Sequence, residues 1–474
     1  MKQGFNPYLP SWEYIPDGEP HVFGDRVYVY GSHDRFNGYS YCLNDYVCYS
    51  APVTDLKDWR YEGVIYDRDE DPRNKDGEAC LYAPDVCRGV DGRYYLYYVL
   101  DEENIVSVAV SDTPAGRYKF YGYVHDDRGG ILGEREGDEP QFDPGVLCED
   151  GRCYLYTGFC MPVDKGRHGP MATVLGPDML TIIEEPRFIA PSAPYSKGSG
   201  YEGHEFFEAS SIRKADGRYY FIYSSVQGHE LCYAVSDSPL EGFVYGGTIV
   251  SNVDKGIDTY KPADMLVGCP DNNHGSIEKI DGKWYVFWHR HTNNHGFIRQ
   301  GCIEPIEIDE NGAIAQVEIT SCGPNGGPLA GEGTYPAYIA CNMIFDAPES
   351  ERRVMPGKRR SPKFPYVTQD GRDGDQNPGY VANMDPGVLV GFKYFDCKGT
   401  RLTEIRTRGY AFKGDMEVLT QWDGEPIGRI PVGRANEWKR WQADIAIPDG
   451  VQALYFRFNG FGFISLLDFT LSKD

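Results

Sequence analysis

Short runs of aromatic and β-branched residues recur along the chain, and clusters of glycine, proline, asparagine and aspartate separate them. Five of these runs follow an Asp-Gly or Gly-Asp pair, whose aspartates are Asp25, Asp91, Asp150, Asp216 and Asp281. Such a pair between two strand-like runs indicates a β-hairpin, because the tight turn needs residues that tolerate a positive φ. The pattern therefore predicts five hairpins.

The five hairpins recur at nearly regular intervals, with 59 to 66 residues between successive aspartates. An interval of this length holds a four-stranded antiparallel sheet with its loops, and such sheets arranged around an axis form a β-propeller. We therefore expect an all-β protein in which residues 1–325 form a five-bladed β-propeller. A plain β-sandwich with generic hairpins is the alternative.

A titratable residue lies six to eight positions before each of the five aspartates: Asp17, Asp85, Asp143, Glu208 and His274. The first strand of each propeller blade lines the central channel, so we expect these side chains to meet there. Like charges at short range raise one another's pKa and destabilise the fold, so such a cluster suggests chemistry. A turn-capping role for each residue is the alternative.

The surroundings of these carboxyl groups suggest separate roles. Glu208 has apolar neighbours that would raise its pKa toward that of a general acid. Asp17 lies in a turn, where a solvated carboxylate could stay ionised as a base, and Asp85 would tune the acid. Nearby aromatic residues offer flat faces on which sugar rings can stack: Trp12, Tyr82, Phe142, Phe206 and Phe207.

Four short motifs follow Asp17 in order: Ala83-Pro84-Asp85-Val86, Phe142-Asp143-Pro144-Gly145-Val146, Phe207-Glu208-Ala209-Ser210 and Asn273-His274-Gly275-Ser276. In this order and phase the chain resembles glycoside hydrolase family 43 over residues 5 to 320. The resemblance implies a five-bladed propeller of inverting enzymes, mostly α-L-arabinofuranosidases, β-xylosidases and endo-arabinanases.

The resemblance also implies roles for single residues. Asp17 would be the general base, Asp85 the residue that modulates the pKa, and Glu208 the general acid. The family base is usually followed by proline, but Gly18 follows Asp17 here, so Glu19 is a rival for the base.

The remaining site residues expected from the resemblance bind substrate or an ion. Arg299 matches an arginine that approaches the substrate, with a structural ion pair as the alternative, and Asp143 is expected beside the sugar. His274 resembles the axial histidine that often holds Ca²⁺, and a hydrogen-bonding role is its alternative. His289 and His291 lack the further ligands that zinc would need.

A turn-rich connector, Cys322 to Gly333, ends the repeat and indicates a domain boundary. Residues 335–474 are strand-like apart from a basic stretch, residues 352–365, which we expect to be a solvated loop. We expect a β-sandwich of jelly-roll type, and its arrangement resembles a family 6 carbohydrate-binding module. A domain that only braces the propeller or completes its pocket is the alternative, in which Trp422, Trp438 and Trp441 pack internally.

Charge and cysteine content narrow the partners. Lys and Arg number 47 against 71 Asp and Glu, so a net charge of −24 disfavours nucleic acid and anionic membranes as partners. The 13 cysteines form no C-x-x-C pair, and Cys148, Cys153, Cys232 and Cys302 fit free thiols inside strands. With no export signal at the N-terminus, we expect a cytoplasmic protein, although removal of a signal peptide would give the same pattern.

The resemblance, together with the expected cytoplasmic location, implies an exo-acting hydrolase that releases terminal α-L-arabinofuranosyl units from plant-derived oligosaccharides. β-D-Xylosidase and then β-galactofuranosidase activity are alternatives, because the sequence separates these sugars poorly. A non-catalytic propeller that only binds carbohydrate is the alternative from another class. Ca²⁺ is the only cofactor expected, and the oligomeric state stays open.

Overall fold

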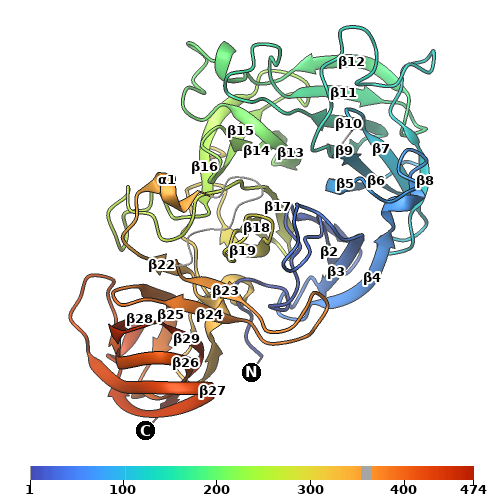
Figure 1. Cartoon of the computed structure of the whole chain (residues 1–474). Helices are drawn as coiled ribbons and strands as arrows, with labels where there is room; N and C mark the ends of the chain where they lie inside the picture. The colour runs from blue at the N-terminus through green and yellow to red at the C-terminus, as the bar shows by residue number, and fades with distance from the viewer. Residues whose placement is uncertain (1, 102, 354–363, 474) are drawn as a thin grey trace.

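The computed structural model describes residues 2–101, 103–353 and 364–473 (Figure 1). Within these ranges the regular secondary structure is almost entirely β-strand, and the one α-helix is the four-residue α1 (Glu349–Arg352). Most of the basic stretch expected as a loop, residues 354–363, lies outside the described residues. No helix in the described part of the chain has the length and apolarity needed to cross a membrane.

Five antiparallel sheets follow one another along the chain and surround a common centre (Figure 1). The first two sheets contain β1 (Glu19–Phe23), β2 (Arg26–Tyr30), β3 (Tyr46–Pro52) and β4 (Arg60–Tyr66), then β5 (Leu81–Arg88), β6 (Tyr94–Leu100), β7 (Ser107–Ser111) and β8 (Lys119–Tyr123). The next two contain β9 (Gly145–Glu149), β10 (Arg152–Thr157), β11 (Met171–Leu175) and β12 (Ile182–Phe188), then β13 (Phe206–Ala215), β14 (Arg218–Ser225), β15 (Glu230–Ser236) and β16 (Val244–Ser251). The fifth contains β17 (Gly275–Ile280), β18 (Lys283–Arg290) and β19 (Gln300–Ile306). The prediction of a five-bladed β-propeller is confirmed.

The five predicted hairpins join the first two strands of the five blades. Asp150, Asp216 and Asp281 have φ values between 47° and 49°, and a glycine with positive φ follows each of them. This is the conformation of the tight hairpin turn, which explains why the same residue pair recurs in the sequence.

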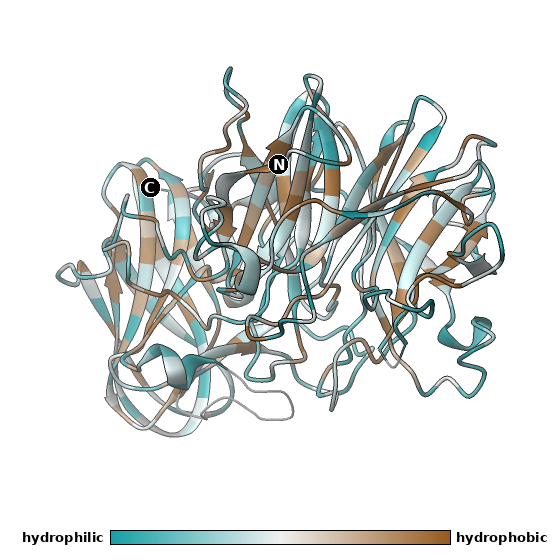
Figure 2. Cartoon of the chain, turned by 90° about the horizontal axis from the view of Figure 1, so that it is seen from above, coloured by the Kyte–Doolittle hydropathy of each residue, from teal (hydrophilic) through white to brown (hydrophobic). Residues whose placement is uncertain are grey.

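Apolar side chains fill the space between neighbouring blades, and Figure 2 shows apolar bands along the strands of the propeller. The ring closes where Val29 of the first blade and Phe287 and Ile303 of the fifth share one cluster. Asn6 strengthens this closure, because its side chain exchanges two hydrogen bonds of 2.8 Å with the backbone of Ile303. A closed ring fixes the inner strands around one axis.

The C-terminal domain is a ten-stranded sheet that curls around its own core (Figure 1). Its strands are β20 (Leu329–Ala330), β21 (Gly333–Pro336), β22 (Asn342–Ile344), β23 (Tyr366–Thr368), β24 (Tyr380–Met384), β25 (Leu389–Cys397), β26 (Thr400–Leu419), β27 (Gly428–Ala446), β28 (Gly450–Phe461) and β29 (Ile464–Lys473). Phe392, Phe456 and Phe469 lie at the centre of its core, with ring centroids 4.9 to 5.7 Å apart. The first strand of this sheet, β20, begins at Leu329, slightly before residue 335, the start expected from the sequence.

The cysteines differ from expectation at two positions. Cys148 of β9 and Cys153 of β10 are direct cross-strand partners and form a disulfide, so the expectation of free thiols is wrong for this pair. The other eleven cysteines, Cys232 and Cys302 among them, are buried thiols.

Candidate active site

The innermost strands of the blades surround a cavity of about 220 Å³. It is lined by Asp17, Tyr41, Cys42, Tyr82, Ala83, Phe142, Asp143, Phe159, Glu208, Asn272, His274 and Arg299. Each blade brings a residue to it from the same place: His274 directly precedes a first strand, Asp17 and Asp143 lie two residues before one, and Tyr82 and Glu208 lie near the start of one. Four of the five titratable residues expected at the axis therefore meet.

Asp17 is buried in the wall of the cavity and has a φ of 57°. Nη1 of Arg299 donates to its Oδ1 at 3.0 Å, and Nδ1 of His289 lies 3.2 Å from the same oxygen. Burial alone would raise the pKa of Asp17, but the charge of Arg299 and the contact with His289 hold it well below its ordinary value. An ionised carboxylate in a fixed orientation can act as a general base.

Glu208 has the opposite electrostatic setting. Burial, and then the charge of Asp17, raise the pKa of Glu208 to about 7, against the opposing effects of Arg299 and Asn272. The ladder between β13 and β14 shifts register on both sides of Glu208, and Ala209 has a φ of 70°. Irregularities of this kind re-aim a side chain, and here they accompany a carboxyl group that faces the cavity.

Asp143 links the two sides of the cavity. Its Oδ2 accepts a hydrogen bond from the backbone nitrogen of Ala209 at 3.0 Å and lies 3.6 Å from Nδ1 of His274. Burial, and then the charge of Glu208, raise the pKa of Asp143 well above its ordinary value. Asp143 thus holds the strand that carries Glu208 and interacts electrostatically with it.

The structure does not bring Asp85 into the cavity, so its expected place beside the acid is wrong. Asp85 is fully buried, accepts a hydrogen bond from the backbone nitrogen of Val146 at 2.7 Å and lies 2.6 Å from Nε2 of His21. Ala83 lines the cavity, and Asp85 lies two residues further along the same strand. Two residues of a strand span about 6–7 Å, so Asp85 lies below the floor of the cavity. Asp143 occupies the position expected for Asp85.

His274 lies on the axis between several carboxylates. Its Nδ1 is 3.8 Å from Asp17 Oδ1, and its Nε2 is 4.0 Å from Glu19 Oε1. Burial lowers the pKa of His274 to about 4, so the imidazole is neutral at pH 7. Glu19 Oε1 is buried and accepts no hydrogen bond from the described residues. A neutral imidazole opposite an unpartnered carboxylate oxygen fits a bound cation such as Ca²⁺, which prefers oxygen ligands.

Glu19, the rival for the base, does not line the cavity. Its Oε2 accepts hydrogen bonds from Nη2 of Arg213 at 2.9 Å and from Oγ of Ser211 at 3.1 Å. Asp17 is therefore the carboxylate of this pair that faces the cavity.

Arg299 lines the cavity and also forms the ion pair that was its alternative interpretation. Its Nε and Nη2 donate to the two carboxylate oxygens of Asp34 at 2.9 and 3.0 Å, and its guanidinium lies 4.7 Å from the centre of the Tyr41 ring. This bidentate pair fixes the guanidinium, so Nη1 reaches Asp17 in one orientation.

Aromatic rings form one wall of the cavity. The rings of Tyr82 and Phe142 are 5.8 Å apart, and Phe159 packs 5.1 Å from Phe142. Phe207 lies behind this wall, 5.3 Å from Phe159, and neither Phe207 nor Trp12 lines the cavity. The expected contribution of Phe207 is therefore indirect, and Trp12 lies outside the site.

The tryptophans of the C-terminal domain have partners within the protein. The Arg408 guanidinium lies over both Trp438 and Tyr380, at 4.2 and 4.7 Å from their ring centres. Trp441 donates to Thr407 at 2.8 Å, and Trp422 packs on an apolar cluster of the same domain.

The sequence analysis missed four residues of the lining: Tyr41, Cys42, Phe159 and Asn272. Tyr41 and Cys42 lie in the loop between β2 and β3, and Phe159 follows β10, so all three lie away from the repeated hairpins. Asn272 directly precedes the Asn273-His274 motif, and this was the only signal available.

A carboxylate with a lowered pKa and a carboxyl group with a raised pKa share one cavity and can supply the two proton-transfer groups of glycoside hydrolysis, and the aromatic wall suits a sugar ring. Fold and site together define a glycoside hydrolase. A sequence model of the glycosyl hydrolases family 43 matches residues 15–314, and the chain belongs to this family.

Similar proteins agree with this assignment. A xylosidase/arabinosidase from Thermoclostridium stercorarium is 63% identical over 473 residues, which is 100% of both chains. A solved family 43 β-xylosidase/α-arabinofuranosidase from a compost microbial metagenome, in complex with xylotriose, is 26% identical, with a TM-score of 0.52 over 65% of this chain and 96% of that one. The Bacillus subtilis arabinoxylan arabinofuranohydrolase shares the fold over 99% of this chain and 97% of its own, with 21% identity and a TM-score of 0.52.

Proposed function

We propose that this family 43 enzyme is an inverting exo-glycosidase that releases terminal α-L-arabinofuranosyl units from plant-derived oligosaccharides. The observation that carries the proposal is the small cavity at the propeller axis, about 220 Å³, which suits one terminal sugar and not the middle of a chain.

In this mechanism Glu208 protonates the leaving oxygen, because its raised pKa keeps the proton available near pH 7. Asp17 activates a water molecule from the other side of the sugar, since the two residues come from the first and fourth blades. Asp143, in place of Asp85, anchors the strand that carries Glu208 and interacts electrostatically with its carboxyl group. Arg299 orients Asp17 and donates to the sugar hydroxyls.

β-D-Xylosidase activity is the second candidate, and the name of the Thermoclostridium relative, which covers both activities, favours keeping it. Aryl glycosides of arabinofuranose, xylopyranose and galactofuranose test the choice through kcat/KM. We expect the arabinofuranoside to be the best substrate, a preference for the xylopyranoside would establish the second candidate, and hydrolysis of none would contradict the proposal.

Proton NMR of the first-formed product tests the inverting mechanism. We expect the anomer opposite to that of the substrate, observed before mutarotation, because a water molecule attacks directly from the face opposite the leaving group. A retained anomer would contradict the roles of Asp17 and Glu208.

We also propose that His274 and Glu19 hold a Ca²⁺ ion at the axis. When bound, the ion would add positive charge beside Asp17 and Asp143 and so favour their ionised forms.

We also propose that the protein is located in the cytoplasm, as expected from the sequence. Cell fractionation tests this location.

A further inference from the structure

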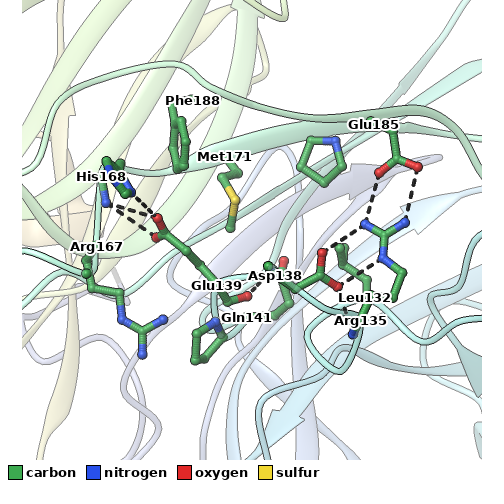
Figure 3. Close-up of a pocket in the computed structure, with 14 residues that line it drawn as sticks. Leu132, Arg135, Asp138, Glu139, Gln141, Arg167, His168, Met171, Glu185 and Phe188 are labelled. Carbon is green, nitrogen blue, oxygen red and sulfur yellow. Dashed lines mark hydrogen bonds and ion pairs between the residues drawn. The ribbon is translucent and has the colours of Figure 1, made fainter.

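A second cavity of about 510 Å³ lies between the loop that joins the second and third blades, the loop between β10 and β11, and strand β12. It is more than twice as large as the active-site cavity. We call it the crest pocket and define it by its lining residues, which lie within segments 132–141, 166–171 and 185–188 (Figure 3). None of these residues takes part in the mechanism above.

Strand directions place the crest pocket at the same end of the blade as the active site. β9 starts just after Asp143, and the antiparallel order puts the start of β11 and the end of β12 at the same edge of the sheet. Met171 and Phe188, at these two strand ends, line the crest pocket. The two cavities share one segment of chain as their wall, because Gln141 lines the crest pocket and Phe142 the active site.

The rings of Phe188 and His168 line the crest pocket, and Tyr195 continues the row beyond the lining. The ring of Phe188 lies 5.3 Å from that of His168, whose ring stacks on Tyr195 at 4.7 Å. Phe188 is 50% exposed and Tyr195 is 46% exposed. Exposed rings fixed by their neighbours offer faces on which the C–H groups of a sugar can pack at little entropic cost.

The polar groups of the crest pocket are held in place by one another (Figure 3). Glu139 Oε1 lies 2.6 Å from Nδ1 of His168, and Arg135 pairs with Asp138 at 3.0 Å and with Glu185 at 2.9 Å. Both signs of charge are present in a protein of net charge −24. This arrangement suits a neutral ligand rich in hydroxyl groups better than an anion.

We propose that the crest pocket binds the leaving-group side of a neutral pentose oligosaccharide whose terminal sugar occupies the active site. The inference rests on the proposed glycosidase function and extends it. It makes the enzyme selective for longer substrates, because only these reach from the active site past Phe142 to the ring of Phe188.

The test compares Phe188→Ala with Phe461→Ala, which removes an equally apolar but remote ring that is 78% exposed on β28. We expect Phe188→Ala to lower kcat/KM on arabinoxylo-oligosaccharides of increasing length by about fivefold to tenfold, chiefly through KM, as for the loss of one sugar-stacking ring. An aryl monoglycoside is too short to reach the pocket, so its hydrolysis should change less than twofold. Phe188→Tyr, which keeps the ring, should retain the length dependence.

Equal losses on short and long substrates, or no loss on long ones, would overturn the inference. Calorimetric binding of xylotetraose to the Glu208→Gln enzyme and to the Glu208→Gln/Phe188→Ala enzyme separates this failure from that of the proposed function. Weaker binding after loss of Phe188 supports the crest pocket even if no glycoside is cleaved, and unchanged binding contradicts it.

Discussion

Three carboxyl groups in one small cavity differ in charge because each has different neighbours. Arg299 and His289 lower the pKa of Asp17, whereas burial and then neighbouring carboxylates raise the pKa of Glu208 and Asp143 against a weaker effect of Arg299. One fixed cation on one side of the cavity thus lowers the pKa of the base and leaves that of the acid high. The acid and base roles follow from the position of Arg299 as much as from the carboxyl groups themselves.

Replacement of Glu208 by alanine should have an effect that depends on the leaving group. We expect Glu208→Ala to lose about 10²–10⁴-fold in kcat on substrates with an alcohol leaving group and much less on aryl glycosides with an activated leaving group, which need no proton. Steady-state kinetics on both substrate types provide the measurement. Equal losses on both would exclude Glu208 as the acid.

The raised pKa of Glu208 also predicts a pH-dependent stability. Between pH 4.5 and about 7 the folded protein keeps a proton that the unfolded chain releases, so the free energy of unfolding falls as pH rises through this window. Glu208→Gln removes this titration. The free energy of unfolding of the variant, relative to that of the wild type, should therefore be higher at pH 8 than at pH 5 by about 1–3 kcal/mol. Calorimetric unfolding at both pH values measures it, and parallel changes in the two proteins would contradict it.

At the scale of elements, the first strand of each blade carries the site because its start meets the axis. Asp17 and Asp143 have positive φ just before β1 and β9, and Ala209 has positive φ next to Glu208. Aspartate tolerates this conformation better than most residues, but alanine does not. The backbone of the inner strands is therefore irregular at the positions from which the carboxyl groups enter the cavity.

A cation at the axis would connect these inner strands. If His274 and Glu19 hold Ca²⁺, dialysis against a chelator should lower both the melting temperature and the activity, and added Ca²⁺ should restore both. Bound ligand stabilises by about 3 kcal/mol when the free ion is at 100 times its dissociation constant. His274→Ala should be insensitive to the chelator, and an unchanged wild-type protein would make His274 a hydrogen-bonding residue only.

Much of the fold could be predicted because each blade repeats the same local chemistry. The hairpin turns need residues that tolerate a positive φ, which the recurring Asp-Gly and Gly-Asp pairs supply, and four of the five residues that lie six to eight positions before the aspartates reach the axis. Asp85 lies only six residues before its hairpin aspartate, the shortest interval of the five, and its side chain does not line the cavity. Tyr41 and Phe159 come from loops whose path depends on packing between distant segments, so no local pattern in the sequence indicates them.

At the scale of the molecule, the C-terminal domain reaches the loop that lines the active site. The segment between β23 and β24 extends toward the first blade (Figure 1), where Asp373 accepts hydrogen bonds from Phe36 N at 2.7 Å and Asn44 Nδ2 at 3.2 Å. Phe36 and Asn44 lie on either side of Tyr41 and Cys42 in the loop between β2 and β3. Asp34, at the start of this loop, anchors Arg299.

Removal of the Asp373 side chain should therefore affect substrate binding from the other domain. We expect Asp373→Ala to raise KM by up to about tenfold, the value of a hydrogen bond to a charged group, with little change in kcat or melting temperature. Amide hydrogen exchange should become faster in residues 34–44 only. Asp396→Ala, which removes an exposed aspartate of β25 in the same domain, is the matched control. Unchanged exchange and KM, or a loss that follows the melting temperature, would show that the C-terminal domain does not position this loop.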